Sequence, residues 1–397
     1  MLKNFIKFIL GFIFFLIIQF CKLFMNIRIG KFPSTRIGPF ITSVEIVAAK
    51  KKELNIRSLD IWSHNKAKEP NEFLSKIVSR EINFINHCVY NFIEYFFNVI
   101  KVKKYKKFFF LVPSTRDNMN LFDKYPNVLK FKDDEIDYAK KILKKNKVDL
   151  SKKIVCLNVR DSAYLKDLFP DKDMSYHDRR DAEVNDYKDV IKYLVSKNYV
   201  VIRMGKKMKH EVNFKHENFI DYPFASFKED ILDIYFGYIC DFTISTGSGW
   251  DSVPFCFRKP ILYTNMSSIS KIQLSSKRFM TTFKLAKNKK GNLMKINELL
   301  LNDLKLISNI YSDNNNLFSD ISFINNSPEE LLESTKEFLN YLIGYTLSPS
   351  QKKFQEKFFD NYDPLLVRDI YGEQAHSANI KGVISSTFLE KYEKDLF

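Results

Sequence analysis

Apolar and polar positions alternate most regularly in the second half of the chain. Five short apolar runs, rich in Val, Ile and Phe and mostly separated by helical patterns, lie at 154–159, 199–204, 219–222, 242–245 and 261–263. Strands that alternate with helices form βαβ units around a parallel sheet. We therefore predict a doubly wound α/β domain here. A strand order of 3-2-1-4-5 would place the first and fourth runs side by side, where the order reverses and such sheets bind ligands.

The first half of the chain has a less regular pattern. It predicts an extended stretch at 27–33, a helix at 41–54, a strand at 58–62, helices near 71–80 and 86–100, and an apolar strand at 108–112. A further helix at 133–146 begins with acids and ends with lysines, as the helix dipole prefers. The polar segment 144–152 then marks a domain boundary.

These patterns predict two Rossmann-like, doubly wound α/β domains preceded by a hydrophobic helix. The predicted parts are a helix at 1–26, an N-terminal α/β domain at 27–148, a C-terminal Rossmann-like domain at 149–325, and C-terminal helices at 326–397 that pack back on the domains. The last part begins with Ser327, Pro328 and Glu330, an N-terminal capping sequence whose role is structural.

The N-terminal apolar run, FILGFIFFLIIQFC at 8–21, is of borderline length for a membrane span, which needs about 20 apolar residues. A short span, an uncleaved anchor and a helix lying on the membrane are all compatible with it. The alternative is a helix buried against the first domain. No small-residue cleavage site follows, and the basic residues that come next favour a body on the cytoplasmic face of the inner membrane.

Composition narrows the class of ligand. The chain has 397 residues, 45% of them hydrophobic, and a net charge of +16, which suggests an anionic partner. The five cysteines are scattered, as in a reducing compartment, and the six histidines show no metal-binding spacing. We therefore expect neither a metal nor a cofactor.

Three polar loops follow strands of the predicted sheet and would meet at its carboxyl edge. They are VRDSAY at 159–164, RMGKK at 203–207 and TGSG at 246–249. The last is neither a Walker loop nor a GxGxxG fingerprint, but a glycine turn before a helix presents backbone N–H groups with little side-chain bulk. Arginine suits phosphate oxygens. We expect a phosphate-bearing ligand at this edge.

Several ordered segments resemble a bacterial family of glycosyltransferases of the GT-B fold. They are RIG at 36–38, VRDSAYL at 159–165, RRDAEVNDY at 179–187, VIRMG at 201–205, TGSGWDSVP at 246–254, KPILYTN at 259–265 and ISSTFLEKY at 384–392. A more distant similarity is to heptosyltransferases and fucosyltransferases. Pro39 stands where the family has histidine, which puts an acceptor or catalytic role for that position in doubt, and Glu183 stands where Asp is more usual.

The resemblance implies a nucleotide-sugar donor on the C-terminal domain and an acceptor on the N-terminal one, with metal-independent catalysis. The leaving diphosphate would be stabilised by the backbone amides at 247–249 and by Arg160 or Arg203, with Arg160 as the catalytic candidate. Asp161 is the candidate base, with Asp178 and Asp181 as alternatives. The candidate donor-binding residues are Arg160, Tyr164, Arg180, Arg203, Gly205, Thr246, Gly247, Ser248, Gly249 and Asp251. Arg36 and Gly38 are the acceptor-side candidates. For Asp161, a turn residue or a partner that orients Arg160 is the structural alternative.

The main functional hypothesis is transfer of a sugar from a nucleotide sugar to a lipid-linked or polysaccharide acceptor at a membrane surface. A membrane-tethered, non-catalytic nucleotide-binding scaffold is a second hypothesis, to which Pro39 gives some support. A basic nucleic-acid-binding protein is a third, but no nucleic-acid recognition motif occurs and most aromatics lie in apolar runs. We expect no nucleic-acid partner. The sequence does not set the oligomeric state.

Overall fold

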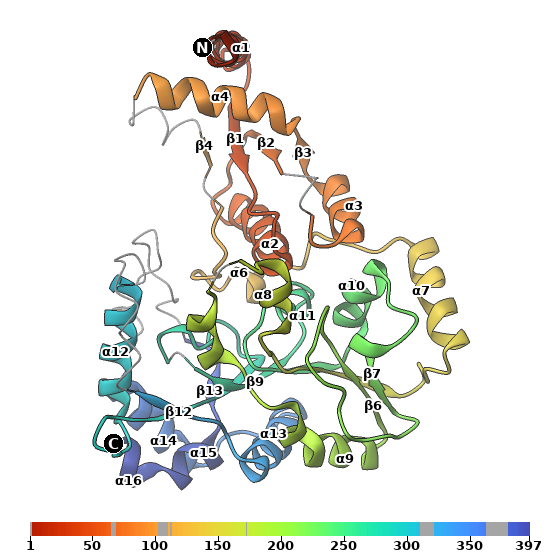
Figure 1. Cartoon of the computed structure of the whole chain (residues 1–397), viewed down its shortest axis with the longest axis vertical. Helices are drawn as coiled ribbons and strands as arrows, with labels where there is room; N and C mark the ends of the chain where they lie inside the picture. The colour runs from red at the N-terminus through yellow and green to blue at the C-terminus, as the bar shows by residue number, and fades with distance from the viewer. Residues whose placement is uncertain are drawn as a thin grey trace. The chain divides into compact units, whose positions relative to one another are not determined.

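The computed structural model describes residues 2–64, 69–101, 110–111, 113–171, 173–267, 269–309, 321–362 and 380–397. The chain divides into two compact units (Figure 1). Unit 1 comprises Met1–Arg116 and Lys124–Lys132, and unit 2 comprises Asp117–Asp123 and Asp133–Phe397.

Unit 1 contains a four-stranded parallel sheet with the order β3-β2-β1-β4. Its strands are β1 (Ile27–Lys31), β2 (Leu59–Ser63), β3 (Asn83–Phe84) and β4 (Phe110–Leu111). The pairing of β1 with β2 is fixed by Arg28, which donates two hydrogen bonds of 2.7 Å to the Asp60 carboxylate. Most of the strand predicted at 108–112 lies outside the described residues.

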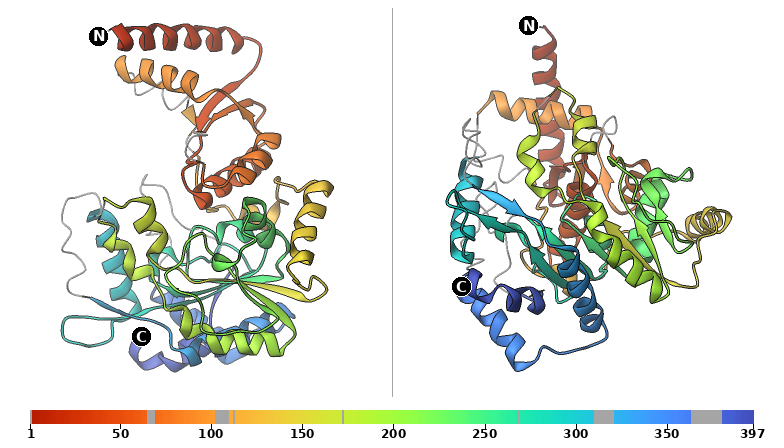
Figure 2. Two further views of the ribbon diagram at one scale, coloured as in Figure 1. Left: turned by 45° about the vertical axis from the view of Figure 1, so that its right-hand side comes forward. Right: turned by 60° about the horizontal axis from the view of Figure 1, so that its bottom comes forward.

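The helices in the described part of unit 1 are α1 (Leu2–Cys21), α2 (Ile37–Glu53), α3 (Glu72–Glu81) and α4 (His87–Val99). Asn71 caps α3 by accepting a hydrogen bond from the Leu74 N–H at 2.7 Å. Helices α1 and α4 lie side by side, as the left view of Figure 2 shows. Ile93 and Phe97 of α4 belong to the same buried cluster as Ile27 and Ile29 of the sheet. The predicted N-terminal apolar helix is therefore present and packed on this unit.

Unit 2 contains a seven-stranded parallel sheet with the order β13-β10-β9-β8-β5-β6-β7. Its strands are β5 (Lys153–Asn158), β6 (Tyr199–Arg203), β7 (Phe219–Asp221), β8 (Phe242–Ser245), β9 (Ile261–Met266), β10 (Phe279–Phe283) and β13 (Val383–Ile384). The five predicted runs form β5 to β9, and their predicted 3-2-1-4-5 order is confirmed. Strands β10 and β13 extend the sheet beyond β9.

Helices and a small antiparallel pair complete unit 2. They are α7 (Asp133–Lys145), α8 (Ala163–Leu168), α9 (Lys188–Ser196), α10 (Asp230–Ile239), α11 (Ser252–Cys256), α12 (Ile296–Asn309), α13 (Pro328–Leu342), α14 (Pro349–Asp360), α15 (Ser386–Lys391) and α16 (Glu393–Leu396), with β11 (Leu285–Lys287) and β12 (Ser322–Ile324). A four-residue helix, α6 (Leu121–Lys124), lies where the chain passes between the units.

Apolar faces of α9 and α13 join the buried cluster of the unit 2 sheet. The capping box predicted at Ser327 and Glu330 is present at the start of α13. Farther along α13, the buried Glu337 accepts hydrogen bonds from Ser385 Oγ at 2.7 Å and from the Ser386 N–H at 2.8 Å. These bonds attach the C-terminal segment that begins at Ser385 to α13 of unit 2.

Helix α7 also belongs to unit 2, although the sequence pattern places it in the N-terminal domain. Its buried face presents Ala139 and Leu143, and Tyr138 donates a 3.0 Å hydrogen bond to Glu229 just before α10. The α/β class is confirmed for both units: each has a parallel sheet whose strand order reverses beside its first strand.

Candidate functional site

The loops that follow β5 and β8 are joined where the strand order of unit 2 reverses. The Arg160 N–H donates a hydrogen bond to Thr246 Oγ1 at 2.9 Å, and the Thr246 N–H donates one to the Asn158 carbonyl at 3.1 Å. Asn158 Nδ2 donates a further bond to Ser248 Oγ at 2.6 Å. The glycine turn is thus held against the end of β5.

The glycine turn at 246–249 has a backbone that requires glycine at one position. Gly247 has a φ of +76°, and a Cβ at this position would lie 2.7 Å from Met266 Sδ. Below the turn, Ser245 Oγ accepts a 3.2 Å hydrogen bond from the Gly247 N–H and donates one of 2.9 Å to Asp251. Burial raises the pKa of the Asp251 carboxyl to about 7. Asp251 therefore stabilises the turn through its hydrogen bond with Ser245.

The helix after this turn is shorter than the sequence suggests. Helix α11 spans the five residues Ser252–Cys256. Because a macrodipole needs several aligned turns of peptide units, α11 adds little to the attraction of an anion. The positive charge of this region comes instead from side chains.

Arg160 is a buried cation at the turn, with 9% of its side chain exposed. Its Nη1 donates a 3.0 Å hydrogen bond to the His177 carbonyl and pairs with Asp181. Its Nη2 is buried and has no hydrogen-bond partner among the described residues. A buried guanidinium nitrogen without a hydrogen-bond acceptor destabilises the protein, and a ligand oxygen that accepts this hydrogen bond would remove the penalty.

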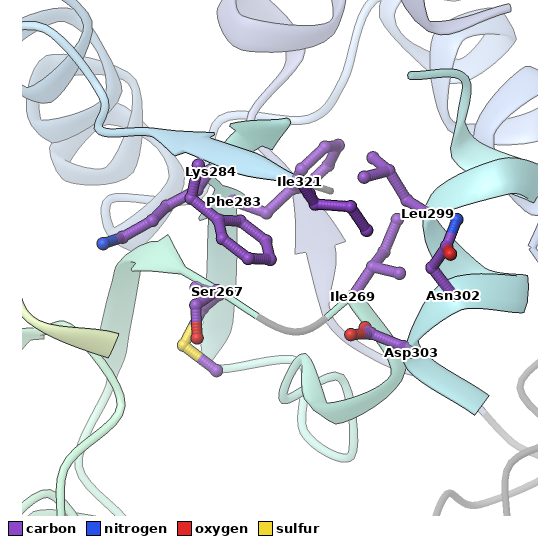
Figure 3. Close-up of a pocket in the computed structure, with 10 residues that line it drawn as sticks. Ser267, Ile269, Phe283, Lys284, Leu299, Asn302, Asp303 and Ile321 are labelled. Atoms are coloured by element: carbon purple, nitrogen blue, oxygen red, sulfur yellow. The ribbon is translucent and has the colours of Figure 1, made fainter. Parts of the chain in front are cut away.

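Two further cations lie beside Arg160. Arg180 Nη2 donates a 2.5 Å hydrogen bond to the Gly247 carbonyl. Lys284, immediately after β10, is 5% exposed, and its Nζ donates a 2.6 Å hydrogen bond to the Asp181 carbonyl. Figure 3 shows the Lys284 amine directed away from Phe283 and Leu299. We call Arg160, Arg180 and Lys284 the cation cluster.

The pKa values show that these cations interact. Burial, followed by repulsion from Arg180, lowers the pKa of Arg160 to about 10. Burial, followed by repulsion from Arg160, lowers the pKa of Lys284 to about 8. Asp181 pairs directly with Arg160, and the charges of Asp178 and Asp161 act against the repulsion between the cations. A ligand with phosphate charge would relieve this repulsion.

Asp161 has a structural role in this arrangement. Its Oδ1 accepts a 2.9 Å hydrogen bond from the Ala163 N–H at the start of α8, and its Oδ2 accepts one of 2.9 Å from the Lys209 N–H. Both carboxylate oxygens are therefore engaged by backbone donors. This corresponds to the turn alternative for Asp161, and it ties the loop after β6 to the loop after β5.

Arg203 does not join the cation cluster. It is 1% exposed and donates hydrogen bonds to both Asp221 oxygens at 3.2 Å and to the His210 carbonyl at 2.7 Å. Its charge is thus balanced by a carboxylate on the neighbouring strand β7. These bonds give Arg203 a structural role in the sheet, and its predicted phosphate contact stays a prediction. Gly205, two residues later, has a φ of +152° and would bring a Cβ to 2.1 Å from Met208.

The remaining candidates are distributed over both units. Tyr164 lies in the first turn of α8, and Asp178 lies in the exposed part of the 3₁₀ segment Ser175–Arg180. Arg36 and Gly38 belong to unit 1, at the start of α2. Their roles stay predictions.

Lys284 is not among the residues that the sequence predicts for this site. The signal is a lysine directly after the short apolar run FMTTF, which forms β10. Two threonines weaken the apolar pattern of that run. Thr281 and Thr282 are nonetheless buried, and Thr282 donates a 2.8 Å hydrogen bond to Asn326.

A small pocket lies on the other side of Lys284, between the ends of β9 and β10 and helix α12 (Figure 3). Its volume is about 10 Å³, which is enough for a single water molecule. At its rim, Asp303 accepts a 2.9 Å hydrogen bond from the Ser270 N–H. The pocket is too small for a nucleobase or a sugar.

Within the described ranges, no three His, Cys, Asp or Glu side chains gather in a way that could hold a metal ion. No known protein-family model matches the sequence. No curated protein matches it either.

Comparison with solved structures finds glycosyltransferases. Escherichia coli ADP-heptose lipopolysaccharide heptosyltransferase II is 12% identical, with a TM-score of 0.43 over 80% of this chain and 98% of that one. A family 9 glycosyl transferase from Veillonella parvula is 9% identical, with a TM-score of 0.37 over 60% and 80%. The iron-containing dodecameric glycosyltransferase TibC from enterotoxigenic E. coli is 10% identical, with a TM-score of 0.31 over 60% and 57%. An assignment of activity to this chain rests on its own site residues.

Proposed function

We propose that this protein is a glycosyltransferase whose unit 2 binds the diphosphate of a nucleotide sugar at the cation cluster. The observation that carries the proposal is the buried Arg160, whose unpartnered Nη2 lies beside Arg180, Lys284 and the Gly247 turn. Ligands of doubly wound sheets bind at the carboxyl ends of strands where the order reverses, which is where these groups lie. The ordered motifs at 159–165, 201–205 and 246–254 support a sugar donor.

The chemistry assigned to the cluster is stabilisation of the leaving group. In glycosyl transfer the bond between the anomeric carbon and the diphosphate oxygen breaks, and its electron pair remains on the diphosphate. The acceptor hydroxyl forms the new bond and loses its proton. Cations that are already fixed in place stabilise the developing charge without reorganisation, which is the main advantage of such a site.

We assign no general base. Both oxygens of Asp161 accept backbone N–H groups, and Asp181 pairs with Arg160. In the proposal, the acceptor is a lipid-linked intermediate or a growing surface glycan at the cytoplasmic face of the inner membrane. Arg36 and Gly38 are kept as acceptor-side candidates on unit 1.

Calorimetric titration of the full chain with UDP, GDP, ADP and CDP tests the binding step. We expect one of these to bind, and Arg160→Ala and Lys284→Met each to weaken its binding at least about tenfold, as loss of a charged hydrogen bond requires. Lys192→Ala is the control, because Lys192 is exposed and pairs only locally with Asp189. Equal affinities for all variants would contradict diphosphate binding at the cation cluster.

Release of nucleoside diphosphate from a panel of nucleotide sugars, in the presence of membrane lipid extract, tests the transfer step. Turnover lost in Arg160→Ala but kept in Lys192→Ala supports the enzyme. Binding without turnover for any donor would favour the non-catalytic scaffold. Salt-sensitive binding of oligonucleotides without binding of nucleoside diphosphates would favour the nucleic-acid hypothesis.

A further inference from the structure

Helix α1 presents an apolar face to its surroundings rather than to the protein. The outward residues recur at helical spacing and are at least 38% exposed: Leu2, Phe5, Ile6, Ile9, Phe12, Ile13, Leu16, Ile17 and Phe20. From Phe5 to Phe20 every exposed residue of α1 is hydrophobic, and Lys3 and Asn4 are also exposed at the start of the helix. The apolar surface continues past the helix in Leu23, Phe24 and Met25, which are 50% to 77% exposed. A contiguous exposed apolar surface of this kind marks an interaction site.

The opposite face of α1 is docked closely on α4. A Cβ on Gly11 would lie 2.2 Å from the Phe92 carbonyl oxygen, so the two backbones approach as closely as a glycine permits. The rings of Phe8 and Phe15 lie 5.3 and 5.5 Å from that of Phe96. Ile18 of α1 belongs to the same buried cluster as the sheet of unit 1. The helix is thus an integral layer of this unit.

This docking is incompatible with a membrane span. Helix α4 has 13 residues and is about 20 Å long, short of the roughly 30 Å hydrocarbon core. It carries Asn91, Glu94 and Asn98 and packs through Ile93 on the sheet. For α1 to cross a bilayer, either α4 and the sheet would enter the hydrocarbon, or the contact at Gly11 would break.

We infer that α1 lies in the plane of a membrane surface, docked on α4, with its outward apolar face inserted among the lipids of an anionic leaflet. This inference does not rest on the proposed glycosyl transfer.

Charge favours lipid over a second copy of the chain as the occupant of this face. Lys3 is exposed near one end of α1, and Lys7 lies over the Tyr95 ring at 5.9 Å, at the border of the outward face. Lys22 follows the other end of the helix. Lysines that border an apolar helix face are the pattern of helices in the interface of anionic membranes. In a symmetric dimer the same lysines would be brought together and would repel one another.

The first test is flotation of the full chain, made by cell-free synthesis with preformed vesicles of phosphatidylcholine containing about 30% phosphatidylglycerol. We expect the protein to float with these vesicles and less so with phosphatidylcholine alone. Ile13→Glu with Ile17→Glu should lower the bound fraction about tenfold, because both side chains lie on the outward face. Lys336→Glu with Lys353→Glu is the control. It lowers the net charge more than the Ile→Glu pair does, at positions distant in sequence from α1, and so measures the effect of net charge alone.

The second test distinguishes an in-plane helix from a span. Lys3→Cys, in a chain with Cys21 and Cys88 replaced by serine, is treated with a membrane-impermeant maleimide while the vesicles are intact. An in-plane helix leaves residue 3 outside, so we expect full labelling without detergent. Labelling only after detergent is added would establish a span and overturn the inference.

The remaining outcomes are also decisive. A double glutamate variant that still floats, or a wild-type chain that forms a discrete dimer and ignores vesicles, would contradict the inference. Because nucleoside diphosphate binding by unit 2 is measured without lipid, its failure and the failure of membrane binding are seen separately.

Discussion

The backbone N–H of Arg160 donates a hydrogen bond of 2.9 Å to Oγ1 of Thr246, across 86 residues of sequence. Both groups are buried, so the bond links the ends of β5 and β8 without competition from water. It places the arginine of one loop against the glycine turn of the other.

Thr246→Val should therefore weaken both the fold and the site. Valine keeps the branched shape but leaves the Arg160 N–H without an acceptor, at a cost of about 1–3 kcal/mol. Urea unfolding measures this loss, and calorimetry should show weaker nucleoside diphosphate binding. Thr246→Ser, which keeps the hydroxyl, is the control. Equal stability of the valine and serine variants would contradict the role of this bond.

Nucleoside diphosphate affinity should fall as the pH rises above about 8. Lys284 has its pKa lowered to about 8 in the free protein, by burial and then by Arg160. A bound phosphate favours the charged amine, so above this pH binding requires uptake of a proton and weakens by up to about tenfold per pH unit. Titrations between pH 7 and 9.5 measure the slope. Lys284→Arg should flatten it, and a slope unchanged in that variant would exclude Lys284 as the responsible group.

Asp251 should make the protein less stable as the pH rises toward 7. Burial raises its pKa from 3.8 to about 7 in the folded state, so the folded protein holds the proton more tightly than the unfolded chain. The stabilisation is complete below pH 3.8 and is lost as the pH rises through about 7. Asp251→Asn removes the titration. The difference in melting temperature between Asp251→Asn and wild type should grow in favour of the variant from pH 5 to pH 8, and a constant difference would refute the assignment.

Gly247→Ala should destabilise the protein more than Gly291→Ala does. Both glycines have similar φ values, +76° and +79°, so both substitutions carry the strain of a left-handed backbone, about 1–2 kcal/mol. At Gly247 the added Cβ also meets Met266 at 2.7 Å, whereas nothing lies within 4 Å at Gly291. Chemical unfolding of the two variants isolates the steric contribution. We expect only Gly247→Ala to weaken diphosphate binding, and equal effects would argue against a shaped turn.

Asp161→Ala should lower stability by about 1 kcal/mol through loss of the turn at the start of α8. Nucleoside diphosphate binding should not be weakened, because the Asp161 carboxylate hydrogen-bonds backbone groups and only its negative charge acts on Arg160. Urea unfolding measures the change in stability, and calorimetry measures nucleoside diphosphate binding. A variant with wild-type stability but no turnover would instead restore Asp161 as the base.

The order of the unit 2 sheet was predictable because five apolar runs recur between helical patterns, and the doubly wound rule then brings two loops together. The partners of individual charges were not predictable in the same way. Arg203 and Arg160 both follow apolar strands, yet Arg203 is paired with Asp221, which lies on the adjacent strand and whose register only the folded sheet defines. Lys284 was not predicted as a site residue, because the two buried threonines of β10 make its sequence look too polar for a buried strand.

Helix α1 illustrates the same limit. In sequence, polar residues and Gly11 share one sector of the helix with Phe14, Phe15 and Ile18, so the ends of the helix look amphipathic and the middle does not. In the structure Gly11 faces α4, and the wholly apolar sector faces outward. Which face of α1 packs on the protein depends on the close contact between Gly11 and α4, and the spacing of apolar residues in the sequence does not show this contact.

The pairing of α1 with α4 also sets an order of events during synthesis. Helix α1 ends at Cys21 and α4 begins at His87, so the ribosome adds the intervening residues over roughly 3–13 s. For an interval of this length α1 exists without its protein partner. Both faces of α1 therefore lack a protein partner until α4 has been made, and the nascent chain can reach a membrane before the sheet of unit 2 is synthesised.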